Sequence, residues 1–374
     1  MKKIAALVCL FALGLMGTAA AETYPKFKFD PAWPLQMPHG YFFGQIAGMT
    51  TDTHGNIWVI SRPRSIVPQL DEPPQEASGV PAPAVVEFDS KGNFIRGWGG
   101  TYMMSEDERA KFDWPVQEHG IAVDAHDNVW ICGNGKDRKT GKDDNQCLKF
   151  TTDGKFIMQI GHASQSKGSL DTENLNHAAW PVYYAPANEL FIADGYVNRR
   201  VIVFDADTGK FKRMWGAYGN APDDSATRDR TYDPPPAQFN LVHGLTISND
   251  GIVFVADRNN NRVQSFTLDG KFLNEGFVAR EIPMVGFGTV NSVALSGDKD
   301  QRFIYISEGH RQQVRVLDRK TLKEISQASF GHVGQYRDMF LGLHVIITDA
   351  KGNIYTGDGR DGRVLRFNFV GLGH

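Results

Sequence analysis

Three histidines stand at the same place in three similar stretches of the sequence. His119 begins "HGIAVDAHDNVWIC", His243 begins "HGLTISNDGIVFVAD" and His344 begins "HVIITDAKGNIYTG". Each opens an apolar strand, where a buried imidazole needs hydrogen-bond partners or a metal. Three neutral imidazoles with an open fourth position are the ligand set of a catalytic zinc, and nitrogen donors suit zinc better than a hard cation such as calcium. The alternative for any one of them is an ordinary buried histidine with satisfied hydrogen bonds.

Two arginines and a tyrosine form a second candidate group. Arg62 in "VISRP" and Arg258 in "VADRN" occupy matching positions at strand ends, and Tyr196 in "IADGYVNRR" lies one residue further along. An arginine presents a fixed fork of N–H donors to a carboxylate, and a tyrosine beside a metal and an arginine can serve as a base. Surface ion pairs and an aromatic loop anchor are the alternative for these residues.

The elements that must position these residues come from one pattern that recurs six times. Each copy has an apolar strand, a turn rich in Asp, Asn or Gly and a strand with an aromatic residue, and it continues into a second hairpin. Four antiparallel strands per copy predict an all-β fold, a six-bladed β-propeller of NHL-like repeats. The last copy ends after three strands, and we expect "YPKFKFD" near the N-terminus to complete the sixth blade and close the ring.

The register of the repeats predicts where the candidate residues meet. The first positions of the innermost strands are, in blade order, Ala47, His119, Trp180, His243, Asn291 and His344. Histidines therefore occupy blades 2, 4 and 6, about 120° apart around one mouth of the central channel. Arg62, Tyr196, Arg258 and the long insertions fall on the same face, and so does His310. This predicts a walled site, unless the insertions are solvated loops without a function.

The first 21 residues have the layout of a secretory signal peptide, with two lysines, an apolar stretch and "AAA". We therefore expect an exported chain, secreted or periplasmic, whose residues 22–374 form a single domain. Cys9 lies in the signal and lacks the small residues that precede a lipidated cysteine. Because no later apolar stretch is long enough to span a bilayer, we expect no membrane association.

Charge and cysteine content narrow the partners further. Without Lys2 and Lys3, 38 basic residues (40 less 2) face 43 acidic ones, which argues against nucleic acid as a partner. Cys132 and Cys147 remain, and in an oxidising compartment they could pair; two free buried thiols are the alternative. We expect a monomer that acts on a small molecule or peptide carrying a carboxylate.

These segments together resemble the peptidyl-α-hydroxyglycine α-amidating lyase family. The resemblance is carried by "HGIAVD", "HGLTIS", "DGYVNRR", "ADRNNNR" and the arginine after "GQIAGMTTDTHGNIWVIS". It implies a zinc ion held by the three histidines, Tyr196 as general base, and Arg62 and Arg258 around the substrate. The implied reaction splits a carbinolamide C–N bond and releases an amide and glyoxylate. Zinc would bind and acidify the hydroxyl, Tyr196 would accept its proton, and an arginine would hold the carboxylate.

The sequence departs from the family pattern at two positions. In the family an aspartate that binds a structural calcium follows the third histidine, whereas Val345 follows His344 here, so we do not expect that calcium. The family's cysteine after the tyrosine is Val197 here, which removes a disulfide that would brace the loop. Tyr196 must then be held by other contacts.

Two other functions fit the same fold. One is a metal-dependent hydrolase, such as the lactonases that share six-bladed propellers, but these rely on oxygen-rich ligand sets for calcium-like ions. The other is a non-catalytic NHL propeller that binds a protein or glycan through its loop face.

Overall fold

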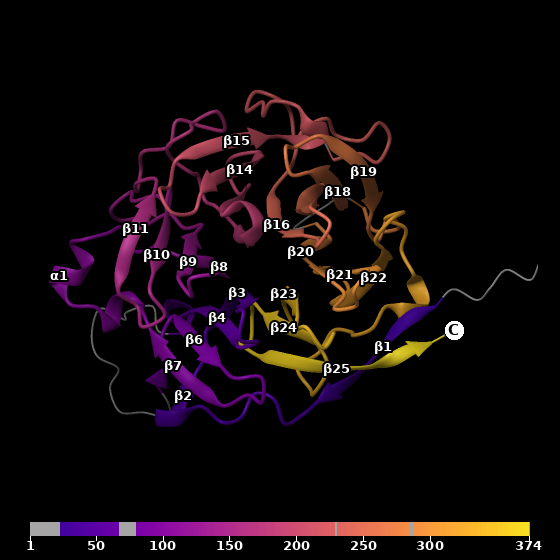
Figure 1. The fold of residues 1–374 in the computed structure, drawn as a ribbon, viewed down its shortest axis with the longest axis horizontal. Helices are drawn as coiled ribbons and strands as arrows, with labels where there is room; N and C mark the ends of the chain where they lie inside the picture. The colour runs from indigo at the N-terminus through magenta and orange to yellow at the C-terminus, as the bar shows by residue number, and fades with distance from the viewer. Residues whose placement is uncertain (1–22, 67–79, 229, 284–287, 374) are drawn as a thin grey trace, which may run out of the picture.

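The computed structural model describes residues 23–66, 80–228, 230–283 and 288–373. The expected signal peptide and most of the Pro-rich insertion of the first blade lie outside these residues. Six of the seven β-sheets in the described residues are arranged as blades around a central channel (Figure 1). The six-bladed β-propeller predicted from the repeats is therefore confirmed.

The strands of the first three blades follow the chain from the channel outwards. Blade 1 consists of β3 (Gln45–Thr51), β4 (Ile57–Arg62), β6 (Val85–Phe88) and β7 (Phe94–Trp98). Blade 2 consists of β8 (Glu118–Val123), β9 (Val129–Gly133), β10 (Cys147–Phe150) and β11 (Phe156–Ile160). Blade 3 consists of β12 (Trp180–Tyr184), β13 (Glu189–Asp194), β14 (Arg200–Asp205) and β15 (Phe211–Trp215).

The remaining blades keep the same direction but differ in their outer strands. Blade 4 consists of β16 (Val242–Ile247), β17 (Ile252–Asp257), β18 (Arg262–Thr267) and β19 (Phe272–Phe277). Blade 5 consists of β20 (Val290–Leu295), β21 (Phe303–Glu308) and β22 (Gln313–Asp318). Blade 6 consists of β23 (Leu343–Thr348), β24 (Ile354–Asp358), β25 (Val364–Gly373) and β1 (Tyr24–Asp30).

The N-terminal strand closes the ring as predicted. β1 pairs antiparallel with β25, from Tyr24 opposite Gly373 to Asp30 opposite Arg366, and the two lie side by side in Figure 1 as an indigo and a yellow strand. An ion pair of 2.8 Å joins Arg366 Nη2 to Asp30 Oδ2. The last blade is thus built from both ends of the described chain, and β1 is its outermost strand.

Blade 5 differs from the prediction of four strands, because its described residues form three. In place of an outer strand, isolated bridges pair Val314 with Phe330 and Leu317 with Glu324, on either side of the 3-10 turn Ser326–Ala328. Ile325 and Ala328 are buried three residues apart. That spacing suits a 3-10 turn, whereas a strand would bury alternate residues.

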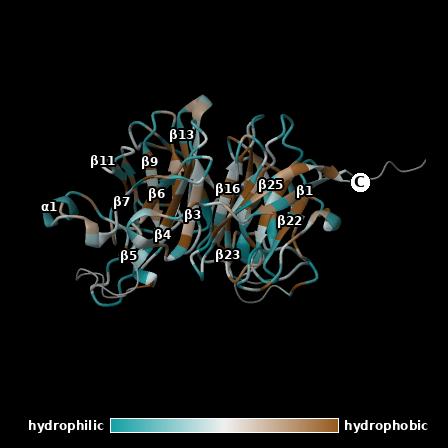
Figure 2. Ribbon diagram, turned by 90° about the horizontal axis from the view of Figure 1, so that it is seen from below, coloured by the Kyte–Doolittle hydropathy of each residue, from teal (hydrophilic) through white to brown (hydrophobic). Residues whose placement is uncertain are grey.

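Recurrent turns and aromatic residues explain why the copies fold alike. In four turns an aspartate side chain accepts from the backbone N–H groups two and four residues further on, as at Asp52, Asp89, Asp124 and Asp349. The second strand of each blade buries one large aromatic side chain, which is at most 2% exposed; these are Trp58, Trp130, Phe191, Phe254, Tyr305 and Tyr355. Figure 2 shows the propeller from the side, with apolar residues in brown along the strands. These residues form cores between neighbouring blades.

The insertions add little regular structure. β2 (Tyr41–Phe42) and β5 (Val80–Pro81) form a short parallel pair, and α1 (Glu106–Arg109) is one turn with a capping box from Ser105. Among the described residues, no helix has the length and apolar character needed to cross a membrane.

Candidate metal centre

The three histidines predicted as ligands come together at the centre of the ring. His119, His243 and His344 each offer one ring nitrogen, and these atoms all lie within 4.8 Å of one another. The ring centroids are 5.0 to 5.1 Å apart. His243 Nε2 and His344 Nε2 are separated by 3.3 Å. The predicted tripod of imidazoles is present in the fold.

A β-bulge places each histidine. The pairing of the innermost strand with the next one shifts between Glu118 and Ile121, between Val242 and Gly244, and between Leu343 and Val345. Each ligand histidine lies inside its shift and so is not opposite a residue of the neighbouring strand. A bulge bends the strand and redirects the side chain. The histidines therefore point to the channel while the rest of each strand keeps its regular alternation.

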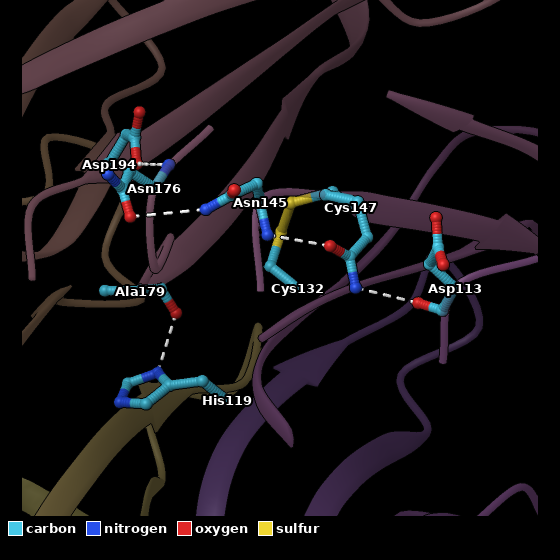
Figure 3. Close-up of a disulfide and its surroundings, with 9 residues drawn as sticks. Asp113, His119, Cys132, Asn145, Cys147, Asn176, Ala179 and Asp194 are labelled. Atoms are coloured by element: carbon cyan, nitrogen blue, oxygen red, sulfur yellow. Dashed lines mark hydrogen bonds between the residues drawn. A yellow bond between two sulfur atoms is a disulfide. The ribbon is translucent and has the colours of Figure 1, made fainter. Parts of the chain in front are cut away.

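Each histidine is oriented by a backbone carbonyl of the following blade. His119 Nδ1 lies 2.7 Å from the Ala179 carbonyl oxygen (Figure 3), and His344 Nδ1 lies 3.1 Å from that of Ile46. His243 Nδ1 is bonded in the same way to Asn291 O. Because a carbonyl oxygen only accepts, Nδ1 carries the hydrogen in all three rings, and each Nε2 of a neutral imidazole presents a lone pair. The even-numbered blades thus supply the histidines, and the odd-numbered blades supply the carbonyls that fix their tautomers.

The glycine after the first histidine allows this close approach. A Cβ atom on Gly120 would lie 2.4 Å from the oxygen of Ala179, the same atom that accepts from His119. A Cβ on Gly244, which follows His243, would meet Asn291 O at 3.4 Å, an ordinary contact. Only the first "HG" pair therefore needs its glycine, which agrees with a valine after His344.

Tyr196 lies against the same ring nitrogens. Its Oη is 2.9 Å from His119 Nε2 and 2.9 Å from His243 Nε2. One phenol proton can be donated to only one of these two lone pairs, and the third, on His344, faces His243 at 3.3 Å. Lone pairs this close repel unless a cation lies among them. The donor set therefore fits a zinc ion with three imidazole ligands and an open position on the Tyr196 side.

The surroundings keep the imidazoles neutral. Burial is the largest cause that lowers the pKa of His119 and His243 well below the usual value, and it lowers the pKa of His344 to about 3. The positive charges of Arg62 and Arg258 add to the lowering at His344. Two guanidinium groups thus act on a centre whose own ligands carry no charge, an environment that attracts anions.

Tyr196 and Arg258 face each other across the junction of blades 3 and 4. The guanidinium carbon of Arg258, which is 7% exposed, lies 5.7 Å from the centroid of the Tyr196 ring. A Cβ atom on Gly195 would lie 2.2 Å from the backbone nitrogen of Val242. The "DGY" sequence therefore lets blade 3 approach blade 4 closely enough to bring the tyrosine to the histidines.

Arg62 is held at the junction of blades 1 and 2. Its Nε donates to Glu118 O at 2.8 Å, Nη1 to Gln45 Oε1 at 3.2 Å and Nη2 to Asn134 Oδ1 at 3.3 Å. These bonds use three of the five N–H groups of the guanidinium. The structure thus brings all six predicted site residues to one end of the channel, whereas His310 is exposed after β21.

Glu118 is a site residue that sequence reasoning missed. It is 5% exposed, and its Oε1 accepts from Trp114 Nε1 at 2.8 Å. Burial is the largest cause that raises the pKa of its carboxyl group, to about 7. The available signal was an acidic residue directly before His119 at the head of an apolar strand.

The segments that carried the family resemblance also have a structural role. Arg200 Nε donates to Asp194 Oδ2 at 2.9 Å, and Arg262 Nε donates to Asp257 Oδ2 at 2.8 Å. All four side chains are fully buried, and in both blades an asparagine amide donates to the same carboxylate. These buried ion pairs fix the loops after β13 and β17, which carry Tyr196 and Arg258.

The two cysteines form the disulfide that the sequence suggested. Cys132 in β9 and Cys147 in β10 are direct cross-strand partners and are bonded through their sulfur atoms (Figure 3). Asn145, two residues before Cys147, donates to Asn176 Oδ1 at 3.2 Å, and the Asn176 backbone donates to Asp194 at 2.9 Å. The disulfide is therefore linked to the loop that carries Tyr196.

Comparison with known proteins identifies the repeat. A family model described as NHL repeat matches residues 239–266, in blade 4. NHL repeat-containing protein 3 of Mus musculus is 26% identical over 346 residues, covering 89% of this chain and 82% of that protein. Peptidyl-alpha-hydroxyglycine alpha-amidating lyase 2 of Drosophila melanogaster is 26% identical over 322 residues, covering 82% of this chain and 66% of that protein.

A longer relative and a solved structure limit what the similarity shows. Peptidyl-glycine alpha-amidating monooxygenase of Mus musculus is 28% identical over 263 residues, which are 67% of this chain but only 23% of that protein. The solved structure titled "Streptogramin B lyase structure" has a TM-score of 0.50 and 14% identity, covers 93% of this chain and 98% of that one, and supports the fold alone. The chain is thus a six-bladed β-propeller with an NHL repeat, similar in sequence to amidating lyases, as its motifs suggested.

Proposed function

We propose that this protein is an exported, zinc-dependent carbon–nitrogen lyase that converts a peptidyl-α-hydroxyglycine, or a similar carbinolamide, into an amide and glyoxylate. The observation that carries the proposal is the convergence of three imidazole lone pairs beside the Tyr196 hydroxyl, with two arginines around them. The similarity to proteins named amidating lyases and monooxygenases supports the same reaction class.

The three histidines would hold the metal. A zinc ion bound there would supply a Lewis acid for the substrate hydroxyl oxygen. His119, His243 and His344 reach the site with their Nε2 atoms already deprotonated, because each Nδ1 hydrogen is committed to a carbonyl. Little reorganisation is therefore needed to form the ligand set.

Tyr196 would move the proton. Its oxygen lies within 2.9 Å of two of the ligand nitrogens, so a hydroxyl group at the centre is within its reach. As a base it takes the hydroxyl proton; the C–O bond becomes a carbonyl, the C–N bond breaks, and the electron pair stays on the amide nitrogen. Tyr196 can then return the same proton to that nitrogen, so the amide and glyoxylate form without a further reactant.

The arginines would bind and orient the substrate. Arg62 is fixed by three hydrogen bonds and keeps two N–H groups outside those bonds, enough for a carboxylate oxygen pair. Arg258 lies over the Tyr196 ring, where its charge stabilises negative charge on the phenol oxygen. The substrate carboxylate would therefore lie next to Arg62 and the reacting hydroxyl next to Tyr196.

The test is glyoxylate release from an N-acyl-α-hydroxyglycine by zinc-loaded protein. Tyr196→Phe should lower kcat by about 100-fold or more, the usual contribution of a positioned base, with zinc content unchanged. Tyr183→Phe, a change of another blade 3 tyrosine whose hydroxyl bonds Asn188, is the matched control and should keep full activity. Absence of glyoxylate with zinc-loaded protein would refute the proposal, and purified protein that contains calcium without zinc would favour a hydrolase instead.

A further inference from the structure

Arg228 connects the loop that carries Tyr196 with Asn240, which precedes β16. It comes from the insertion between blades 3 and 4, and its Nη2 donates at 3.1 Å to the carbonyl of Val197, the residue after Tyr196. Its Nη1 donates at 3.4 Å to Asn240 Oδ1. The Asn240 backbone carbonyl in turn accepts from Asn259 N, next to Arg258. The insertion therefore bonds a guanidinium group directly to the residue after Tyr196 and links it, through Asn240, to the residue after Arg258.

A second arginine lies close to the first. Arg199 is 3% exposed, and its Nη2 donates to Ala226 O at 2.8 Å, within the same insertion. After burial, the charge of Arg199 is the largest cause that lowers the pKa of Arg228. Asp224, whose charge favours the Arg228 cation, is itself engaged by the backbone and hydroxyl of Ser169. The buried Arg199 and the exposed Arg228 thus hold two like charges close together, and an added anion beside them is stabilising.

A buried amide beside Arg228 lacks an acceptor. Asn240 is 2% exposed, and its Oδ1 accepts from Arg228 Nη1 and, at 3.5 Å, from Asn259 Nδ2. Two donors at one atom fix the orientation of the amide. Its Nδ2 then has no acceptor among the described residues, although leaving such a donor buried costs about 1–3 kcal/mol. An oxygen atom of a ligand would remove this cost.

We propose that Arg228, Arg199 and Asn240 form an anion subsite that binds a second carboxylate, on the acyl portion of the substrate. The inference rests on the proposed function, in which Arg62 holds the carboxylate that becomes part of glyoxylate. Arg62 lies at the junction of blades 1 and 2, and the anion subsite lies two blades further around the ring. The enzyme would therefore act best on carbinolamides that carry negative charge at both ends.

A purely structural role for Arg228 makes a different prediction. Its bond to Val197 O could serve only to brace the Tyr196 loop. In that case Arg228→Gln would lower kcat for every substrate alike. An anion subsite instead predicts a rise in KM that is confined to substrates with an anionic acyl group.

The experiment measures the steady-state kinetics of the zinc-loaded protein on two substrates that differ in one charge, N-succinyl-α-hydroxyglycine and N-butyryl-α-hydroxyglycine. The wild-type protein should favour the succinyl compound, and Arg228→Gln should raise its KM about 10- to 100-fold, the effect of losing a hydrogen bond to a charged group, while leaving KM for the butyryl compound unchanged. Arg228→Lys should restore part of the preference. Arg138→Gln, in the blade 2 insertion, removes an equal charge outside the subsite and should change neither constant.

Calorimetric titration separates failure of the subsite from failure of the lyase proposal. N-succinylglycine and N-butyrylglycine lack the reacting hydroxyl and can be tested whether or not the protein releases glyoxylate. Tighter binding of N-succinylglycine that is lost in Arg228→Gln supports the subsite, even if no lyase activity is found. Equal binding of the two compounds by the wild-type protein, or equal kinetic losses on both substrates in Arg228→Gln, would overturn it.

Discussion

The even-numbered and odd-numbered blades share one strand pattern but contribute differently to the centre. Blades 2, 4 and 6 present His119, His243 and His344. Blades 3, 5 and 1 present the backbone carbonyls that accept from the Nδ1 atoms of those histidines. A histidine of the cluster and the carbonyl that orients it therefore never belong to the same blade. The histidine cluster is formed by contacts between blades, and a single repeat does not contain it.

The closing contact of the ring illustrates the same division. His344 in blade 6 is oriented by Ile46 in blade 1, and blade 6 itself is completed by β1 from the N-terminal end. The third histidine is thus oriented by the contact between the last and the first blade.

The largest expected effect comes from removing a ligand of an even-numbered blade. His243→Ala should lower zinc affinity by more than about 100-fold and abolish measurable glyoxylate release, because two imidazoles leave the ion half-coordinated. Bound zinc per chain, measured after dialysis against a weak chelator, and the rate of glyoxylate release check this. Full activity in a correctly folded His243→Ala protein would contradict the assignment of the tripod.

A change in a buried ion pair should affect the fold rather than the metal. Arg262→Met leaves Asp257 buried without its arginine and should lower the free energy of unfolding by about 3–5 kcal/mol. Chemical unfolding followed by circular dichroism measures it. Arg138→Met, at a loop position, should change stability by less than about 0.5 kcal/mol. A loss for Arg262→Met no larger than for this control would mean that the pair does not hold the loop.

Glycine variants test the contribution of the odd-numbered blades. Gly120→Ala would push a Cβ into Ala179 O and displace the carbonyl that orients His119, so zinc affinity should fall about 10- to 100-fold. Gly244→Ala is the matched control, since its Cβ would make only an ordinary 3.4 Å contact with Asn291 O. Competition with a zinc chelator gives both affinities. Equal affinities in the two variants would show that the carbonyl is not needed to orient the ligand.

The smallest expected effect is on the free energy of unfolding, from a change at Glu189 in blade 3, away from the central histidines. Arg213 Nη1 donates to Glu189 Oε1 at 2.8 Å, and this bond is the main cause that lowers the pKa of Glu189. Because the folded pKa lies below the unfolded value of about 4.5, the pair stabilises the fold above that pH, and the contribution is lost as pH falls through the folded pKa. Glu189→Gln should cost roughly 1–2 kcal/mol at pH 7, with the difference shrinking below pH 4.5.

Unfolding free energies of wild type and Glu189→Gln at pH 7, 4.5 and 3 check this prediction. Zinc binding should be unchanged, because Glu189 opens β13 at the end opposite Tyr196. A difference that stays constant down to pH 3 would contradict a role for the ionised carboxylate.

Much of the fold and of the candidate site could be predicted from the sequence, because aligning the six repeats shows which residues occupy equivalent strand positions. Six copies of one strand pattern indicated the propeller, "YPKFKFD" indicated its closure, and the shared position of His119, His243 and His344 indicated that they would meet. The alternation of apolar residues fixes which face of a strand is buried, so the positions that face the channel follow from the pattern. The prediction of a fourth strand in blade 5 was wrong, because a 3-10 turn stands there and buries residues three apart rather than alternate ones.

The rest depended on contacts between residues distant in the chain. The bulges that redirect the histidines, the carbonyls that fix their tautomers, the burial of Glu118 and the approach of Arg228 to Val197 leave no local pattern. Periodicity reports which face a side chain occupies, but hydrogen-bond partners and desolvation are set by the neighbouring blade. The sequence by itself therefore determined the fold and which side chains meet at the centre, and only the tertiary structure decided their orientation, protonation and surroundings.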